Sequence, residues 1–75
     1  MQRIAMVGSG ELSDRLSYYF EDTGFGRVVG MFDDFEAVGA AKNDRPILGK
    51  IEEIPVAFGK GAFDVVAIAI GYRHR

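Results

Sequence analysis

Residues 3–10 read RIAMVGSG, an apolar run of strand length that passes directly into a glycine, a serine and a second glycine. Residues 27–34 read RVVGMFDD, a second apolar run that ends in two aspartates. Between them lies a segment with apolar residues at helical spacing. This order of strand, glycine turn, helix and acid-ended strand is typical of the first β-α-β unit of a nucleotide-binding α/β domain.

The first helix is predicted to begin at Glu11, where the apolar spacing changes to that of a helix. One buried stripe is expected from four residues at i, i+4, i+7 and i+8: Leu12, Leu16, Tyr19 and Phe20. The helix should end near Thr23 and Gly24, because glycine is favoured just past a helix end, and Phe25 should fold back over the last turn.

The rest of the chain completes an α/β pattern. Four segments follow in order: a surface loop with at most one helical turn (36–45), a short edge strand that starts at Pro46 (46–49), a short helix in spite of Pro55 (50–58), and an apolar central strand, DVVAIAI (64–70). We therefore predict a Rossmann-like three-layer α/β domain whose short parallel sheet of about 3–4 strands is flanked by helices.

Composition limits the possible functions. The 75 residues carry a formal charge of −2 and no cysteine, so we expect a single domain over residues 1–75, without disulfides, in a reducing, cytoplasmic compartment. The mixed charge argues against nucleic-acid binding, which needs a basic face. The longest apolar run is too short for a membrane span, and the N-terminus lacks the plan of a signal peptide.

The candidate ligand site lies where the parallel strands end, because open parallel sheets bind ligands beyond the carboxyl ends of their strands. The residues predicted to meet there are Gly8, Ser9, Gly10, Asp33, Asp34, Gly71 and Tyr72. The glycines permit close approach of a pyrophosphate to the helix N-terminus, and a carboxylate after the second strand suits a sugar hydroxyl. The same residues also suit a plain tight turn and a capped loop. Glu11 would repel a phosphate there, and Arg15, one turn on, would partly offset it.

Other tempting residues are interpreted as structural. His74 is the only histidine and has no cysteine or histidine partner for a metal site. Residues 59–61, GKG, lack the spacing of a phosphate-binding P-loop and suggest a turn. We therefore predict no metal site and no catalytic residue in this chain.

Four segments together resemble a known family. They are IAMVGSG, VVGMFDDF, RPILGKIEEIP and VVAIAIGYRHR, and they are similar to the glycine turn, G-x-x-D-D, P-x-L-G and A-I-G segments of one domain. That domain is the N-terminal domain of the NeuD/PglD family of bacterial sugar O- and N-acyltransferases. The resemblance spans nearly the whole chain.

The resemblance implies a nucleotide-sugar substrate, often a UDP-sugar, used in polysaccharide or glycan synthesis. In the family a left-handed β-helix of hexapeptide repeats follows, forms a trimer, and holds acetyl-CoA and the catalytic histidine. Nothing resembling those repeats is present here, so we expect a substrate-binding half that binds no cofactor and does not catalyse transfer alone. By resemblance, residues 8–10 would lie along the diphosphate, Asp33 and Asp34 would face the nucleoside, and residues 71–72 would border the sugar.

One departure from the family keeps alternatives open. The family's turn continues with glycine and histidine where this chain has Glu11 and Leu12. A second hypothesis is the N-terminal dinucleotide-binding part of an NAD(P)-dependent oxidoreductase, which would use the same turn and acidic strand end. A third is a structural α/β domain that has lost its ligand.

Overall fold

A computed structural model describes residues 1–42 and 45–69 of the chain. Its elements, in chain order, are β1 (Gln2–Val7), α1 (Glu11–Asp22), β2 (Gly26–Phe32), β3 (Ala41–Lys42), β4 (Arg45–Gly49), the 3-10 helix η1 (Ile51–Glu53), α2 (Ile54–Gly59) and β5 (Val65–Ile68). Among the described residues no helix has the length and apolar character needed to span a membrane.

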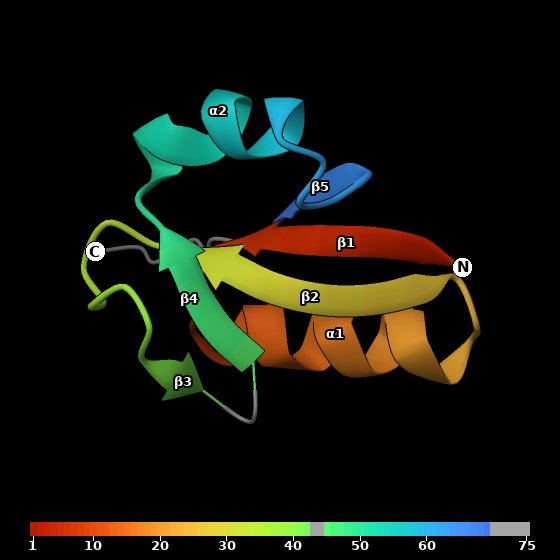
Figure 1. Cartoon of the computed structure of the whole chain (residues 1–75). Helices are drawn as coiled ribbons and strands as arrows, with labels where there is room; N and C mark the ends of the chain where they lie inside the picture. The colour runs from red at the N-terminus through yellow and green to blue at the C-terminus, as the bar shows by residue number, and fades with distance from the viewer. Residues whose placement is uncertain (43–44, 70–75) are drawn as a thin grey trace.

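The strands form one sheet in the order β3-β4-β2-β1-β5 (Figure 1). The neighbours β4, β2, β1 and β5 are parallel. At its carboxyl end β1 pairs Val7 with Phe32 of β2 on one side and with Ile68 of β5 on the other. The predicted α/β fold is confirmed, and the ends of three strands that are distant in sequence lie side by side.

The helices cover opposite faces of the sheet, as Figure 1 shows for α1 and α2. Successive strand residues point to opposite faces, so β1 supplies both cores. Ile4 and Met6 belong to the cluster that Leu16 and Phe20 of α1 cover. Ala5 belongs to a second cluster, which the residues of η1 and α2 cover. The three layers expected of a Rossmann-like domain are therefore present.

The buried face of α1 differs from the predicted stripe. Leu12 and Tyr19 are 39% and 63% exposed, whereas Ser13 and Ser17 are fully buried. The face against the sheet therefore runs through Ser13, Leu16, Ser17 and Phe20. Small serines let the helix backbone approach the strands closely, and Ser17 Oγ donates to the Ser13 carbonyl at 2.8 Å. The apolar pattern was misleading because two of the inward positions carry polar side chains.

The end of α1 is as predicted. Gly24 adopts φ +78° just past the helix, where a left-handed residue favours glycine. The Phe25 N–H donates to the Phe20 carbonyl at 2.9 Å, and the two rings pack with centroids 5.3 Å apart. This paired arrangement turns the chain back into β2.

The second half of the chain corrects three expectations. β5 was predicted to be a central strand, but it forms an edge of the sheet, beside β1. Part of the predicted loop 36–45 forms β3, which pairs antiparallel with β4 through Ala41 opposite Pro46. β3 therefore occupies the edge that β4 was predicted to form. The second helix is split into η1 and α2, and Pro55 lies in the first turn of α2, where its missing N–H removes no helical hydrogen bond.

Candidate functional site

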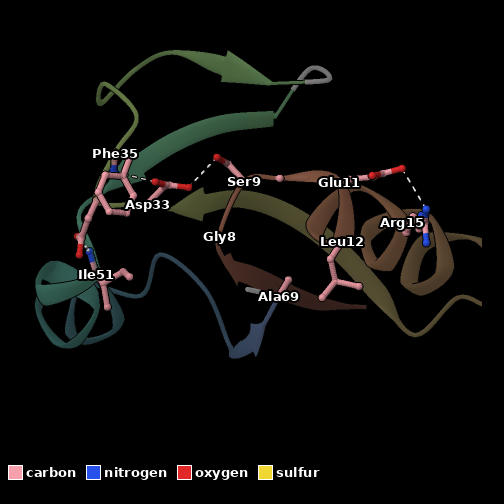
Figure 2. A pocket seen from close by; sticks show the side chains of 11 residues that line it. Gly8, Ser9, Glu11, Leu12, Arg15, Asp33, Phe35, Ile51 and Ala69 are labelled. Atoms are coloured by element: carbon pink, nitrogen blue, oxygen red, sulfur yellow. Dashed lines mark hydrogen bonds and ion pairs between the residues drawn. The ribbon is translucent and has the colours of Figure 1, made fainter. Parts of the chain in front are cut away.

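A pocket of about 370 Å³ opens at the carboxyl ends of the parallel strands, a volume typical of small-molecule sites. Its walls come from the turn after β1, the first turns of α1, the loop after β2, the start of η1 and the residue after β5 (Figure 2). Every parallel strand thus contributes to the rim.

The turn after β1 forms the floor between the strand and α1. Gly8 has φ +103°, a conformation that side chains rarely adopt, and its N–H donates to the Phe32 carbonyl at 2.8 Å. Gly10 is the N-cap of α1 and provides no side-chain cap. The first helical hydrogen bond runs from the Asp14 N–H to the Gly10 carbonyl at 3.1 Å. The N–H groups of residues 11–13 therefore precede the helical ladder and carry the partial positive charge of the helix start.

The Asp33 carboxylate is held in place by hydrogen bonds from nearby residues. Ser9 Oγ donates to Oδ2 at 2.7 Å, and the Phe35 N–H donates to Oδ1 at 2.7 Å. Burial raises the pKa of the Asp33 carboxyl, but these hydrogen bonds, together with those from the Ser9 and Glu36 N–H groups, outweigh it, so the pKa lies below its ordinary value. The carboxylate is therefore charged at neutral pH. It also borders the pocket, where it can meet a ligand.

Asp34 holds the start of η1 in place by hydrogen bonds. Its Oδ1 accepts a hydrogen bond from the Ile51 N–H at 3.0 Å, and its carbonyl accepts one from Lys50 Nζ at 3.1 Å. Asp34 therefore satisfies an N–H at the start of η1 and joins the loop after β2 to the segment after β4. Of the two aspartates, Asp33 is the one that crosses to the glycine turn.

The charge at the start of α1 is partly neutralised. Arg15 NH2 forms an ion pair with a Glu11 carboxylate oxygen at 3.0 Å, and both side chains are largely exposed. Figure 2 shows Glu11 extended toward Arg15, on the side away from Asp33. The predicted compensation of Glu11 by Arg15 is present, so the carboxylate does not cover the glycine turn.

The structure brings five of the seven predicted site residues to this pocket: Gly8, Ser9, Gly10, Asp33 and Asp34. Gly71 and Tyr72 lie outside the described residues. Ligand binding by any of them stays a prediction. In the part of the chain that the structure describes, no group of histidine, cysteine and acidic side chains is arranged to hold a metal ion.

Sequence reasoning missed the apolar part of the pocket. Leu12 was assigned to the core, and the roles of Phe35, Ile51 and Ala69 in the lining were not foreseen. Phe35 had a usable signal, because it is a single aromatic residue among acids in DDFE, immediately after a predicted strand. Ile51 had none, since its place depends on the chain folding back from β4.

No protein-family model matches this sequence, and a search of curated proteins finds no match. The resemblance to the acyltransferase family therefore rests on the four segments quoted above and stays a prediction.

Proposed function

We propose that this domain binds a nucleotide-sugar and is the substrate-binding part of a bacterial sugar acetyltransferase. One observation carries the proposal: the glycine turn, the uncapped start of α1 and the charged Asp33 all line one pocket. These are the three groups by which doubly wound domains hold the diphosphate and the ribose of a nucleotide.

The diphosphate is assigned to the turn after β1. Gly8 and Gly10 carry no side chains to keep a ligand from the backbone, and the N–H groups at the start of α1 favour an anion. The ion pair between Arg15 and Glu11 lessens the repulsion that the Glu11 carboxylate exerts on phosphate oxygens.

The nucleoside is assigned to the end of β2. Asp33 is charged, is held by hydrogen bonds from Ser9 and Phe35, and borders the pocket, so its carboxylate suits a sugar hydroxyl. The sugar would extend toward the end of β5. Acetyl-CoA and the histidine base belong, by resemblance, to a separate trimer-forming domain. The cysteine-free sequence fits the cytoplasm, where we place the domain.

A second candidate uses the same groups. An acidic residue roughly 20 residues after the glycine turn is also the partner of the ribose of NAD, and Asp33 occupies that position. The domain would then begin an NAD(P)-dependent oxidoreductase. The short P-I-L-G segment after the double aspartate favours the transferase.

Calorimetric titration with UDP-N-acetylglucosamine beside NAD tests the proposal. We expect the UDP-sugar alone to bind, and Asp33→Asn to weaken it about 10-fold, as for loss of a hydrogen bond to a charged group. Asp22→Asn is the matched control, because Asp22 is exposed at the far end of α1. Binding of NAD alone would establish the oxidoreductase instead. A folded sample that binds neither ligand would leave a structural domain.

A further inference from the structure

Among the residues that the structure describes, Phe35 is the most exposed large hydrophobic residue, with 95% of its surface accessible, and it lines the pocket. An exposed phenylalanine adds nothing to the core and forgoes the free energy of burying its ring. The fold therefore gives no account of an aromatic residue at this position.

Within the described residues, the other exposed aromatic side chains all have partners. Phe25 packs on Phe20 at 5.3 Å between ring centroids, and Phe58 packs on Phe63 at 5.7 Å. Tyr19 meets Phe20, and Tyr18 lies under the Arg45 guanidinium. Across residues 1–42 and 45–69, Phe35 is the one aromatic residue for which no ring or cation contact is found.

The backbone of Phe35 is nevertheless held at the pocket mouth. Its N–H donates to Asp33 Oδ1 at 2.7 Å, which ties the backbone beside its ring to a charged carboxylate. In Figure 2 Phe35 and Ile51 lie on one side of the pocket and Leu12 on the other. A flat, apolar-faced ligand ring placed there would cover Phe35 while its polar edge or attached hydroxyls meet Asp33.

We propose that Phe35 stacks on the base of a bound nucleotide and sets the site's preference for ligands that contain a planar base. The inference rests on the proposed function and deepens it, because it assigns the nucleoside end of the ligand to a residue. Aromatic stacking suits any base, since every base has a π-face. The phosphates then point along the rim toward the start of α1.

Paired titrations test this role. UDP and UMP carry a base, and ribose 5-phosphate does not. We expect Phe35→Ala and Phe35→Leu to lower the affinity for the two nucleotides about 10-fold and to leave ribose 5-phosphate binding unchanged. Val38→Ala is the matched control, because Val38 is 62% exposed in the same loop and is not part of the pocket wall. Thermal unfolding checks that each variant is folded, as expected for exposed positions.

A spectroscopic readout gives independent evidence. The chain contains no tryptophan, so Phe35→Trp introduces a single indole at the pocket mouth. Stacking predicts that UDP or UMP quenches its emission and that ribose 5-phosphate does not.

The failure of each proposal has its own signature. If the wild-type domain binds UDP but Phe35→Ala and Phe35→Leu bind it equally well, the stacking role is overturned and the proposed function stands. If the wild type binds UDP and ribose 5-phosphate with equal affinity, the stacking role is likewise overturned and the proposed function stands. If the folded wild type binds none of the three ligands, both proposals fail.

Discussion

The polar groups at the two ends of the sheet are arranged differently. At the amino ends, Arg3 of β1 and Asp64 before β5 satisfy each other: Arg3 NH2 and Nε reach the two Asp64 oxygens at 2.9 and 3.2 Å. Arg3 NH1 donates to the Gly61 carbonyl at 2.7 Å. The Arg3 N–H donates to Asp64 Oδ2 at 2.9 Å, and the Asp64 N–H donates to the Arg3 carbonyl at 2.8 Å. The charged side chains at this end therefore satisfy each other.

At the carboxyl ends the polar groups border an open pocket. The start of α1 has no side-chain cap, and the Asp33 carboxylate, hydrogen-bonded by Ser9 and Phe35, lines the pocket wall. The pocket lies here. The difference teaches that charge alone does not mark a site in this fold, because both ends are charged. The candidate site is marked instead by a charged carboxylate and a helix start without a side-chain cap that line one open pocket.

The largest expected effect is on stability and belongs to the amino end. A methyl group on Gly26, at the start of β2, would lie 2.6 Å from Ile4 Cδ1 and 2.8 Å from the Gln2 carbonyl oxygen. Gly26→Ala should therefore lower the free energy of unfolding by about 1–3 kcal/mol through overpacking, measured by urea unfolding. UDP affinity of the folded fraction should not change. A drop in affinity equal to that of a pocket variant would contradict the separation of the two ends.

Gly10→Ala is the corresponding change at the carboxyl end. A methyl group there meets no atom within 4 Å, and Gly10 has an ordinary φ of −85°. The free energy of unfolding should fall by only about 0.5–1 kcal/mol, since alanine is a poorer N-cap than glycine. Titration should show UDP affinity reduced several-fold, because the methyl group keeps phosphates from the backbone. Unchanged affinity would mean that no ligand approaches this turn.

The sequence allowed the frame of the fold to be predicted where several signals agreed. The apolar run before Gly8, the helix end just before Gly24 and the aspartates after β2 each have a local physical cause, so their places were correct. The buried face of α1 could not be predicted, because Ser13 and Ser17 are buried for their size rather than for their polarity.

The candidate site was predicted in the same way, in part. Its polar rim follows strand ends and is visible in the sequence. The pairing of Asp33 with Ser9, the use of Asp34 to hold η1, and the isolation of Phe35 depend on contacts between segments far apart in the chain. No local pattern contains that information.

A smaller effect should come from removing charge at the start of α1. Glu11→Gln removes a carboxylate beside the turn and releases Arg15 from its 3.0 Å ion pair. We expect UDP affinity to rise about 2–5-fold at low salt, and less at high salt because exposed charges are screened. Asp22→Asn, at the other end of the helix, should change little. Weaker binding of Glu11→Gln would show that Glu11 contacts the ligand rather than repelling it.

The smallest expected effect is a change in stability and in ligand affinity at acidic pH. It tests the carboxylates at the two ends of the sheet, Asp64 and Asp33, separately. Hydrogen bonds from Arg3 hold the pKa of the Asp64 carboxyl below its ordinary value, and the pKa of Asp33 is lowered as well. A lowered pKa in the folded state contributes stability that is present above the unfolded value, about 4, and is lost as the pH falls through the folded value. Urea unfolding from about pH 6 to about pH 3 should therefore show a loss of stability that Asp64→Asn makes shallower.

Ligand affinity should follow a different residue over the same pH range. UDP binding should weaken as Asp33 is protonated, because the carboxylic acid is a poorer acceptor than the carboxylate. Asp33→Asn should start weaker and lose this pH dependence, whereas Asp64→Asn should keep it. If Asp64→Asn flattened the pH profile of binding, the amino end would be coupled to the pocket, and the amino and carboxyl ends of the sheet would act as one unit.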